Sequence, residues 1–297
     1  MTNPRGTDAI TERTGRPEGR RILSIDIEDV IIANSEMNLK EPPAGYRDTV
    51  AHSLRRTLDL LDEAGAKATF FVGGRYCREH DGLFREAVAG GHVLASHGFH
   101  HSDIRKLSLR EFRDDLRRSL DVLSRYQSDI IGYRPPAFTM PFDDPHLRIL
   151  ADNGIRYVSC GTLVNRVRIP HVDRPVPLSR DIAYVPISIR YLLGGFLPYP
   201  VGYGHTSRLM PENLSVRMAR RFAETHDYFH FYFHPYEVPG LTRDQKRRLY
   251  RTSCDLGFLV YSRRSHDRSR LFRRILEGGG FRPIESLRRN ADGSLAI

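Results

Sequence analysis

The amino-acid sequence predicts an α/β fold of alternating strands and helices, with a parallel sheet that is either open or closed into a barrel. Two observations predict it. Short apolar runs of strand length alternate with longer segments whose apolar residues recur at helical spacing. Polar clusters follow several of the short runs, which is where parallel α/β folds place their functional sites.

From residue 21 onward, the chain supplies the elements of this fold in order. Ile22–Ile27 is a buried strand by composition, and Thr49–Ala64 carries leucines at the spacing of a helix. Ser108, with Glu111 three residues later, forms a capping-box pattern that opens another helix. The same criteria predict further strands at 68–72, 92–95, 130–133, 155–158, 184–189, 228–233 and 281–284, and further helices at 83–89, 145–153 and 211–225.

Composition excludes several classes of protein. The chain has 297 residues, of which 40% are hydrophobic, and its 15 Phe and 14 Tyr argue against a disordered chain. No segment reaches the roughly 18 apolar residues of a spanning helix. Three widely separated cysteines exclude a disulfide framework and a thiolate zinc finger, and we expect them to be buried, reduced thiols: Cys77, Cys160 and Cys254.

The ends of the chain differ from its middle. Residues 1–20 are polar and lack the apolar run of a signal peptide, so we expect a disordered lead-in and a cytoplasmic protein. Residues 21–297 are expected to form a single domain whose Arg-rich helical part begins near residue 240.

The net charge of +10 has two explanations that the sequence leaves open. Only four of the 46 basic residues are lysine, a bias that arises from GC-rich codons as readily as from an anionic partner. The densest runs, Arg243–Arg251 and Arg263–Arg274, alternate with apolar residues as amphipathic helices do, and a peripheral membrane contact through them is one option. No nucleic-acid-binding motif is present, so we expect no nucleic-acid partner.

Three acids lie at the end of the first predicted strand and just beyond it. Asp26 and Glu28 lie on one face of that strand by alternation, and Asp29 follows in the turn. An acidic loop cap is the simplest explanation. Three carboxylates directly after a buried strand are nevertheless costly without a cation or hydrogen-bond donors nearby.

Two histidines follow the third predicted strand. His97 and His101 are four residues apart, so one helical turn would bring both imidazoles to the same side, as in a metal chelate. Surface or packing histidines are the alternative. Beside a carboxylate from the neighbouring strand, the pair becomes a candidate carboxylate-plus-two-histidine metal site.

The order of these fragments resembles the polysaccharide deacetylases with a NodB-homology domain, carbohydrate esterase family 4. The resemblance spans about residues 21–240 and is greatest to the branch associated with exopolysaccharide synthesis. It is carried by Ser24-Ile25-Asp26-Ile27-Glu28-Asp29, Ser96-His97-Gly98-Phe99-His100-His101, Tyr133-Arg134-Pro135-Pro136, Gly194-Gly195-Phe196-Leu197-Pro198-Tyr199 and His234-Pro235-Tyr236-Glu237. It implies a distorted (β/α) barrel of about seven parallel strands.

The resemblance also implies a role for each matched residue: Asp26 as catalytic base, Glu28 as metal carboxylate, His97 and His101 as metal histidines, Arg134 as the residue that orients the base, and His234 as general acid. Asp29 is a second candidate for the metal carboxylate. The implied cofactor is a divalent ion, with Zn²⁺ first and Co²⁺ or another ion as alternatives.

The implied reaction is removal of an N-acetyl group from an amino sugar of a polysaccharide or of its lipid-linked or nucleotide-linked precursor. Two alternatives stay open: a metal-dependent amidohydrolase acting on a small cyclic amide or imide, and a catalytically silent glycan-binding protein. One position departs from the family pattern. Val158 stands where many relatives have an acid that supports the histidine acid. Either another acid, such as Asp181, supports His234, or the pKa of His234 is set in another way.

Overall fold

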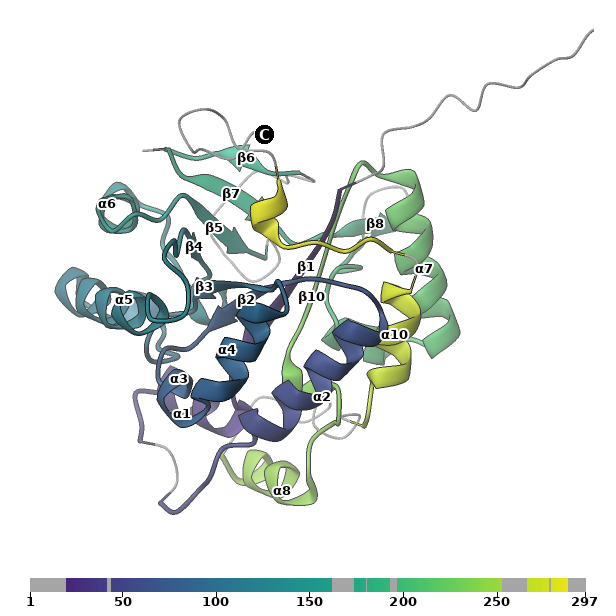
Figure 1. The fold of residues 1–297 in the computed structure, drawn as a ribbon, viewed down its shortest axis with the longest axis horizontal. Coiled ribbons are helices and arrows are strands. Elements are labelled where there is room, and N and C mark those ends of the chain that lie inside the picture. Colours follow the sequence, from purple (N-terminus) through teal and green to yellow (C-terminus); the bar gives the residue numbers. More distant parts are fainter. Residues whose placement is uncertain are drawn as a thin grey trace, which may run out of the picture.

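The computed structural model describes residues 20–41, 44–161, 174–179, 181–192, 197–252, 266–277 and 279–287, in which strands and helices alternate (Figure 1). Of the expected lead-in at 1–20, only Arg20 falls within these ranges, and the first strand begins there. Cys254, Gly194–Phe196 and part of Arg263–Arg274 also lie outside the described residues. Cys77 and Cys160 are both buried, as the sequence predicts, and Cys77 is a free thiol.

The main sheet in the described part of the chain has eight strands, in the order β10-β1-β2-β3-β4-β5-β7-β6. Every neighbouring pair is parallel except β6 and β7, so seven strands form one parallel array and the predicted distorted (β/α) barrel is confirmed. The strands are β1 (Arg20–Ile27), β2 (Thr69–Val72), β3 (Val93–Ser96), β4 (Gly132–Tyr133), β5 (Tyr157–Cys160), β6 (Val176–Pro177), β7 (Ala183–Pro186) and β10 (Tyr228–Phe233); β8 (Arg190–Leu192) and β9 (Leu197–Tyr199) form a separate antiparallel pair.

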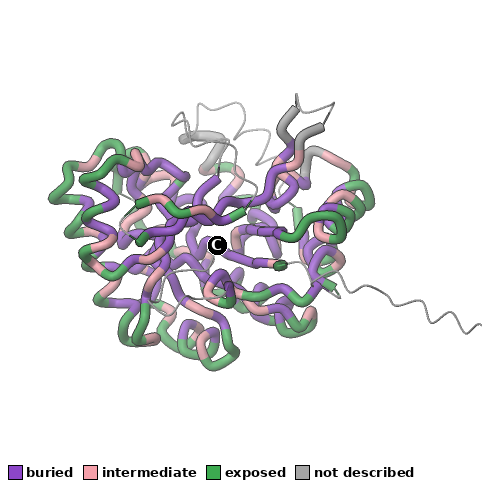
Figure 2. Tube along the Cα trace, turned by 90° about the horizontal axis from the view of Figure 1, so that it is seen from above, coloured by how far each residue is buried: buried purple, intermediate pink, exposed green. Residues whose placement is uncertain are grey.

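Helices cover the outer face of this sheet (Figures 1 and 2). The α-helices are α1 (Val30–Met37), α2 (Val50–Glu63), α3 (Tyr76–Glu79), α4 (Asp81–Ala89), α5 (Leu109–Leu123), α6 (Asp144–Asp152), α7 (Glu212–Thr225), α8 (Arg243–Thr252) and α10 (Ser269–Leu276). The capping box predicted at Ser108 and Glu111 is present. Within the described ranges, no helix is both long and apolar enough to cross a bilayer.

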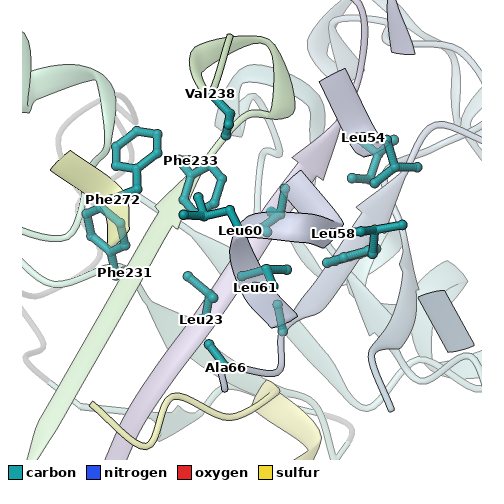
Figure 3. Close-up of a cluster of buried hydrophobic side chains, with 14 of the residues drawn as sticks. Leu23, Leu54, Leu58, Leu60, Leu61, Ala66, Phe231, Phe233, Val238 and Phe272 are labelled. Carbon is teal, nitrogen blue, oxygen red and sulfur yellow. The ribbon is translucent and has the colours of Figure 1, made fainter. Parts of the chain in front are cut away.

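Alternation along the strands separates two environments. On β1, Leu23 faces outward and packs with leucines of α2, with Phe231 and Phe233 of β10 and with Phe272 of α10 (Figure 3). The next residue, Ser24, faces the barrel interior, where it contacts polar side chains. The barrel therefore has an apolar outer layer and a polar inner layer near the carboxyl ends of its strands.

Backbone contacts close the gap between β7 and β10. Ser188 N donates to the carbonyl of His230 (3.2 Å), and Gly202 N donates to the carbonyl of Ser188 (2.8 Å). A Cβ at residue 202 would lie 2.2 Å from the His230 carbonyl oxygen, so only glycine permits this approach. The seam curls the sheet into a barrel and fixes the inner face of β10.

Among the elements that differ from the sequence prediction, two have a clear physical reason. The strand expected at 281–284 is reduced to one bridge between Arg282 and Ile22, because the next N–H on that side, of Ile284, donates to the Thr69 hydroxyl (2.9 Å) and a 3-10 turn begins there. Helix α1 was not predicted, because it is buried on nearly all sides and shows no amphipathic pattern.

His92, which precedes β3, gives a testable pH dependence of stability. It is buried, stacks on Phe70, and accepts a hydrogen bond from Ala68 N at Nδ1 (3.2 Å). Burial and then Lys67 lower the pKa of His92 from 6.5 to about 4. Between pH 6.5 and pH 4, His92 is therefore protonated in the unfolded chain but neutral in the folded chain. The free energy of unfolding falls as the pH drops through this range, by roughly 3 kcal/mol at most.

We expect urea unfolding of His92→Asn to lose this part of the acid dependence, since Asn keeps an acceptor but does not titrate. The comparison is the unfolding free energy of the two proteins at pH 7 and pH 4.5. An equal acid destabilisation in both would contradict the assignment.

Candidate active site

The polar residues singled out in the sequence meet at the carboxyl ends of β1, β3, β4 and β10. Strand register brings them to one level, because Ile27 pairs with Val72, Val72 with Ser96, and Ser96 with Tyr133. On the other side of β1, Ile25 pairs with Phe233, the residue before His234. All seven candidate residues except His234 and His101 are less than one-tenth exposed, and those two are largely buried.

Glu28, His97 and His101 form a cluster of convergent ligand atoms, all within 4.8 Å of one another. The Nε2 atoms of His97 and His101 lie 3.5 and 2.7 Å from Oε2 of Glu28. His97 Nδ1 lies 2.8 Å from the backbone carbonyl of Arg134, which can only accept a hydrogen bond. Nδ1 of His97 therefore carries the proton, and its Nε2 lone pair is left for the cluster.

This cluster fits a divalent cation. Oε2 of Glu28 is buried and makes no hydrogen bond of good geometry, although His101 Nε2 lies 2.7 Å from it. Buried carboxylate oxygens are normally paired, and lone pairs directed at a common point are the arrangement that a bound cation satisfies. Two imidazoles and one carboxylate are a donor set typical of zinc and related ions, with positions left open.

A loop, rather than the helical turn that the sequence suggested, brings the two histidines together. Gly98 has φ +79°, which ends β3 in a sharp turn, and a Cβ there would lie 2.8 Å from Oδ2 of Asp115. Asp115, from α5, accepts from the N–H groups of Phe99 (2.8 Å) and His100 (3.0 Å). The His97 and His101 rings meet edge to face, with centroids 5.2 Å apart.

Asp29 has a different place from the one considered in the sequence. Its Oδ1 caps α1 by accepting from the N–H groups of Ile31 and Ile32, and its Oδ2 accepts from Thr49 N and Oγ1 and from Tyr46. Both oxygens are thus occupied, and Asp29 belongs to none of the possible ligand groups in the described ranges. The geometry favours Glu28 as the ligand carboxylate.

Asp26 forms a buried ion pair with Arg134. Nη1 of Arg134 donates to Oδ1 of Asp26, while Nη2 donates to the hydroxyls of Ser24 (2.8 Å) and Ser159 (2.7 Å). The guanidinium also lies over the ring of Phe71, 4.0 Å from its centroid. Arg134 is fully buried, so these contacts fix the orientation of the Asp26 carboxylate.

His234 lies near the other carboxylate oxygen of Glu28, Oε1, whereas His97 and His101 lie near Oε2. Its Nε2 is 3.5 Å from Oε1 of Glu28, and its Nδ1 is 3.0 Å from Oε1 of Glu237. Burial alone would lower the pKa of His234, but the charges of Glu28 and Glu237 outweigh it and raise the pKa above 6.5. This histidine is therefore suited to carry a proton near neutral pH.

Glu237, and not Asp181, supports His234. The glutamate is three residues after the histidine, and its Oε1 also accepts from the His234 backbone N–H (3.0 Å). Asp181 lies exposed in the turn before β7, while Val158 is part of the apolar core. The spacing of a cap residue and an acid three positions later was the sequence signal for this contact.

A model of the family described as polysaccharide deacetylase matches residues 44–158. A curated relative, the peptidoglycan-N-acetylglucosamine deacetylase of Bacillus cereus, is 26% identical over 89 residues, covering 30% of this chain and 31% of the relative. Both matches are similarities to polysaccharide deacetylases over part of the chain. The chain thus aligns with only about a third of that relative's length.

One solved structure supports the fold, and a second is similar to this chain at a lower score. A putative polysaccharide deacetylase from Mycobacterium smegmatis has a TM-score of 0.52 and 20% identity, over 75% of this chain and 79% of that one. A pseudoenzyme of the CE4 family from Bacillus anthracis has a TM-score of 0.47 and 15% identity, over 90% of this chain and 64% of that one.

Residues outside the deacetylase-like motifs complete the site. Glu36 of α1 is buried; its Oε2 accepts from His101 N (2.8 Å), and its Oε1 contacts His100 Nδ1 (3.2 Å) and Arg75. His205 lies beside His234, with ring centroids 6.5 Å apart. Sequence reasoning missed both, because α1 was not predicted and His205 stands alone in a Gly-rich segment.

Matched amide substitutions separate the two candidate carboxylates. We expect Glu28→Gln to lower Zn²⁺ affinity by more than the roughly 10–100-fold that partners outside the ligand set contribute, since it removes a ligand charge. Asp29→Asn keeps an N-cap oxygen and should bind Zn²⁺ nearly as the parent does. Affinity is measured by chelator competition, and melting temperature checks that both variants are folded.

The histidines are tested together. The double variant with His97→Ala and His101→Ala should retain no stoichiometric divalent ion after dialysis. Full retention, or equal losses at Glu28 and Asp29, would contradict the site.

Proposed function

We propose that this chain is a metal-dependent hydrolase that removes the acetyl group from an N-acetylated amino sugar of a glycan. One observation carries the proposal. The ligand cluster around Glu28 contacts His234, a histidine held by a carboxylate. The pKa of His234 is also raised by the charge of Asp26, the buried carboxylate that Arg134 orients. A cation site with a base and an acid beside it is the equipment that amide hydrolysis requires.

Amide carbonyls are poor electrophiles, and a divalent ion, when bound, polarises the carbonyl and stabilises the negative charge that develops on its oxygen. Asp26 removes the proton of the attacking water. Arg134 holds the Asp26 carboxylate in one orientation, and its contacts with Ser24 and Ser159 keep the guanidinium from turning.

His234 donates the proton that the leaving amine requires, because an amine is a poor leaving group as an anion. Glu237 accepts from Nδ1, so the ring presents Nε2 towards Glu28 and the ligand cluster. The same carboxylate stabilises the protonated imidazole.

Three finer proposals accompany this one. Zinc is the expected ion, with cobalt as a functional substitute, because both accept two imidazoles and a carboxylate. The sugar is expected in a polysaccharide or in its lipid-linked or nucleotide-linked precursor, which the name of the Bacillus cereus relative supports in so far as it denotes an N-acetyl sugar. The exopolysaccharide-synthesis branch and a cytoplasmic site of action, with peripheral membrane contact through the Arg-rich helices, are proposed on the sequence motifs and charge.

The deciding experiment measures acetate release by the full chain loaded with Zn²⁺. The substrates are chitin oligosaccharides, peptidoglycan fragments and UDP-N-acetylglucosamine. Asp26→Asn should retain Zn²⁺ but lose about 10²–10⁴-fold in kcat, which is what a positioned proton-transfer group contributes. Turnover of cyclic imides with no acetate release would favour the amidohydrolase alternative instead. Binding of Zn²⁺ and glycan without any turnover would favour the catalytically silent glycan-binding protein.

The support of His234 has its own test. Glu237→Ala should lower kcat by about 10²-fold, because the imidazole loses the contact that orients it, while Glu237→Gln, which keeps an acceptor oxygen, should lose less. Asp181→Asn is the matched control and should turn over at the parent rate. A loss at Asp181, or none at Glu237, would reverse the assignment of the supporting acid.

A further inference from the structure

His230 is a buried histidine that the proposed mechanism does not use. It lies on the inner face of β10, four residues before His234, and is fully buried. Its Nε2 is 2.7 Å from the hydroxyl of Ser24, and its Nδ1 is 2.9 Å from the backbone carbonyl of Pro186. A titratable side chain inside a barrel, satisfied on both ring nitrogens, calls for a physical account.

The partners of the ring determine which nitrogen carries the proton. The Tyr228 hydroxyl is 3.1 Å from Nδ1, but it donates its own hydrogen to the Pro186 carbonyl (2.7 Å). That carbonyl and the tyrosine oxygen then both accept, so Nδ1 carries the proton and donates to Pro186. Nε2 then has only a lone pair, and the Ser24 hydroxyl donates to it. Burial, and then the positive charge of Arg134, lower the pKa of His230 well below its ordinary value, so the ring is neutral.

The direction of this bond organises the next one. The Ser24 hydroxyl donates its hydrogen to His230, so the lone pairs of its oxygen face Arg134. Nη2 of Arg134 donates to that oxygen (2.8 Å). A Ser24 hydroxyl turned the other way would present its hydrogen to a cation. His230 thereby makes Ser24 an acceptor at the place where Arg134 needs one.

Arg134 depends heavily on these acceptors. Its side-chain donors reach Asp26, Ser24 and Ser159, whereas its Nε is buried without a hydrogen-bond partner. With Nε unpaired, the rotation of the guanidinium is set by two serines and one carboxylate. Removing one serine contact leaves the group that orients the base less fixed.

We propose that His230 is a positioning residue for Asp26, acting as a neutral acceptor through Ser24 and Arg134. The inference rests on the proposed function and deepens it. The relay joins Asp26, Arg134, Ser24, His230 and the Pro186 carbonyl. Arg134 donates to Asp26 on one side and to Ser24 on the other, and from Ser24 the donated hydrogens continue through His230 to Pro186. A charged ring at residue 230 would reverse it and repel Arg134.

Kinetics of the Zn²⁺-loaded full chain test the relay. His230→Leu should lower kcat about 10- to 100-fold, the cost of a small misplacement, with KM and Zn²⁺ content unchanged. His230→Gln places an amide oxygen near the position of Nε2 and should recover most of the rate. Phe231→Leu, on the opposite face of β10, is the control: it should cost stability but leave kcat unchanged.

A double-mutant cycle distinguishes the relay from simple packing. Ser24→Ala combined with His230→Leu should be little slower than Ser24→Ala alone, since both remove the same chain of contacts. Full additivity, no recovery with Gln, or a folded His230→Leu variant at the parent rate would overturn the proposal.

A spectroscopic measurement needs no substrate. In protein labelled with ¹⁵N-histidine, His230 should show the neutral Nδ1–H tautomer from pH 5 to pH 8, and Ser24→Ala should shift its Nε2 resonance. An Nε2–H tautomer or a protonated ring would overturn the relay even if acetate release were absent. Absent acetate release with the expected tautomer would instead defeat the proposed function alone and leave the hydrogen-bond chain standing.

Discussion

Arg134 carries a full positive charge inside the barrel, where burial of an unpaired ion costs several kcal/mol. The surrounding structure compensates for that charge. Asp26 supplies the counter-charge, Ser24 and Ser159 supply acceptor oxygens, and Phe71 offers the face of its ring. The inner layer of the barrel is polar at this level because the arginine requires it.

The site has two halves, one around Arg134 and Asp26 and the other around Glu28. In one half, acceptor groups surround the guanidinium of Arg134. In the other, Glu28 lies among three imidazoles, and although burial opposes its charge, His101 and His234 lower the pKa of Glu28 well below its ordinary value. The backbone carbonyl of Arg134 joins the halves, since it fixes the tautomer of His97 while its side chain orients Asp26.

Much of the fold follows from the sequence, because strands buried on both faces and amphipathic helices leave clear periodic signals. The run at 228–233 and the helix opened by Ser108 appear where predicted. The candidate site residues were identifiable because polar groups after buried strands are rare.

What the sequence left out depends on contacts between distant segments. An aspartate that caps a helix and one that binds a cation look alike in a sequence, so Asp29 was ambiguous until α1 was known. The histidine pair suggested a helical turn, whereas Gly98 makes a loop that Asp115 and Glu36 hold from two different helices. The closing seam at Gly202 has no periodic signal at all.

The pairing of β1 with β10 has a consequence for biosynthesis. These neighbours in the sheet are separated by some two hundred residues of chain, so β1 is an open sheet edge until β10 has left the ribosome. Asp26 and Arg134 can form their ion pair before β10 is synthesised, but β10 does not yet cover that pair on its side of the barrel. Contacts of such long range make folding slow, and a nascent chain truncated before residue 228 would expose an apolar strand edge open to aggregation.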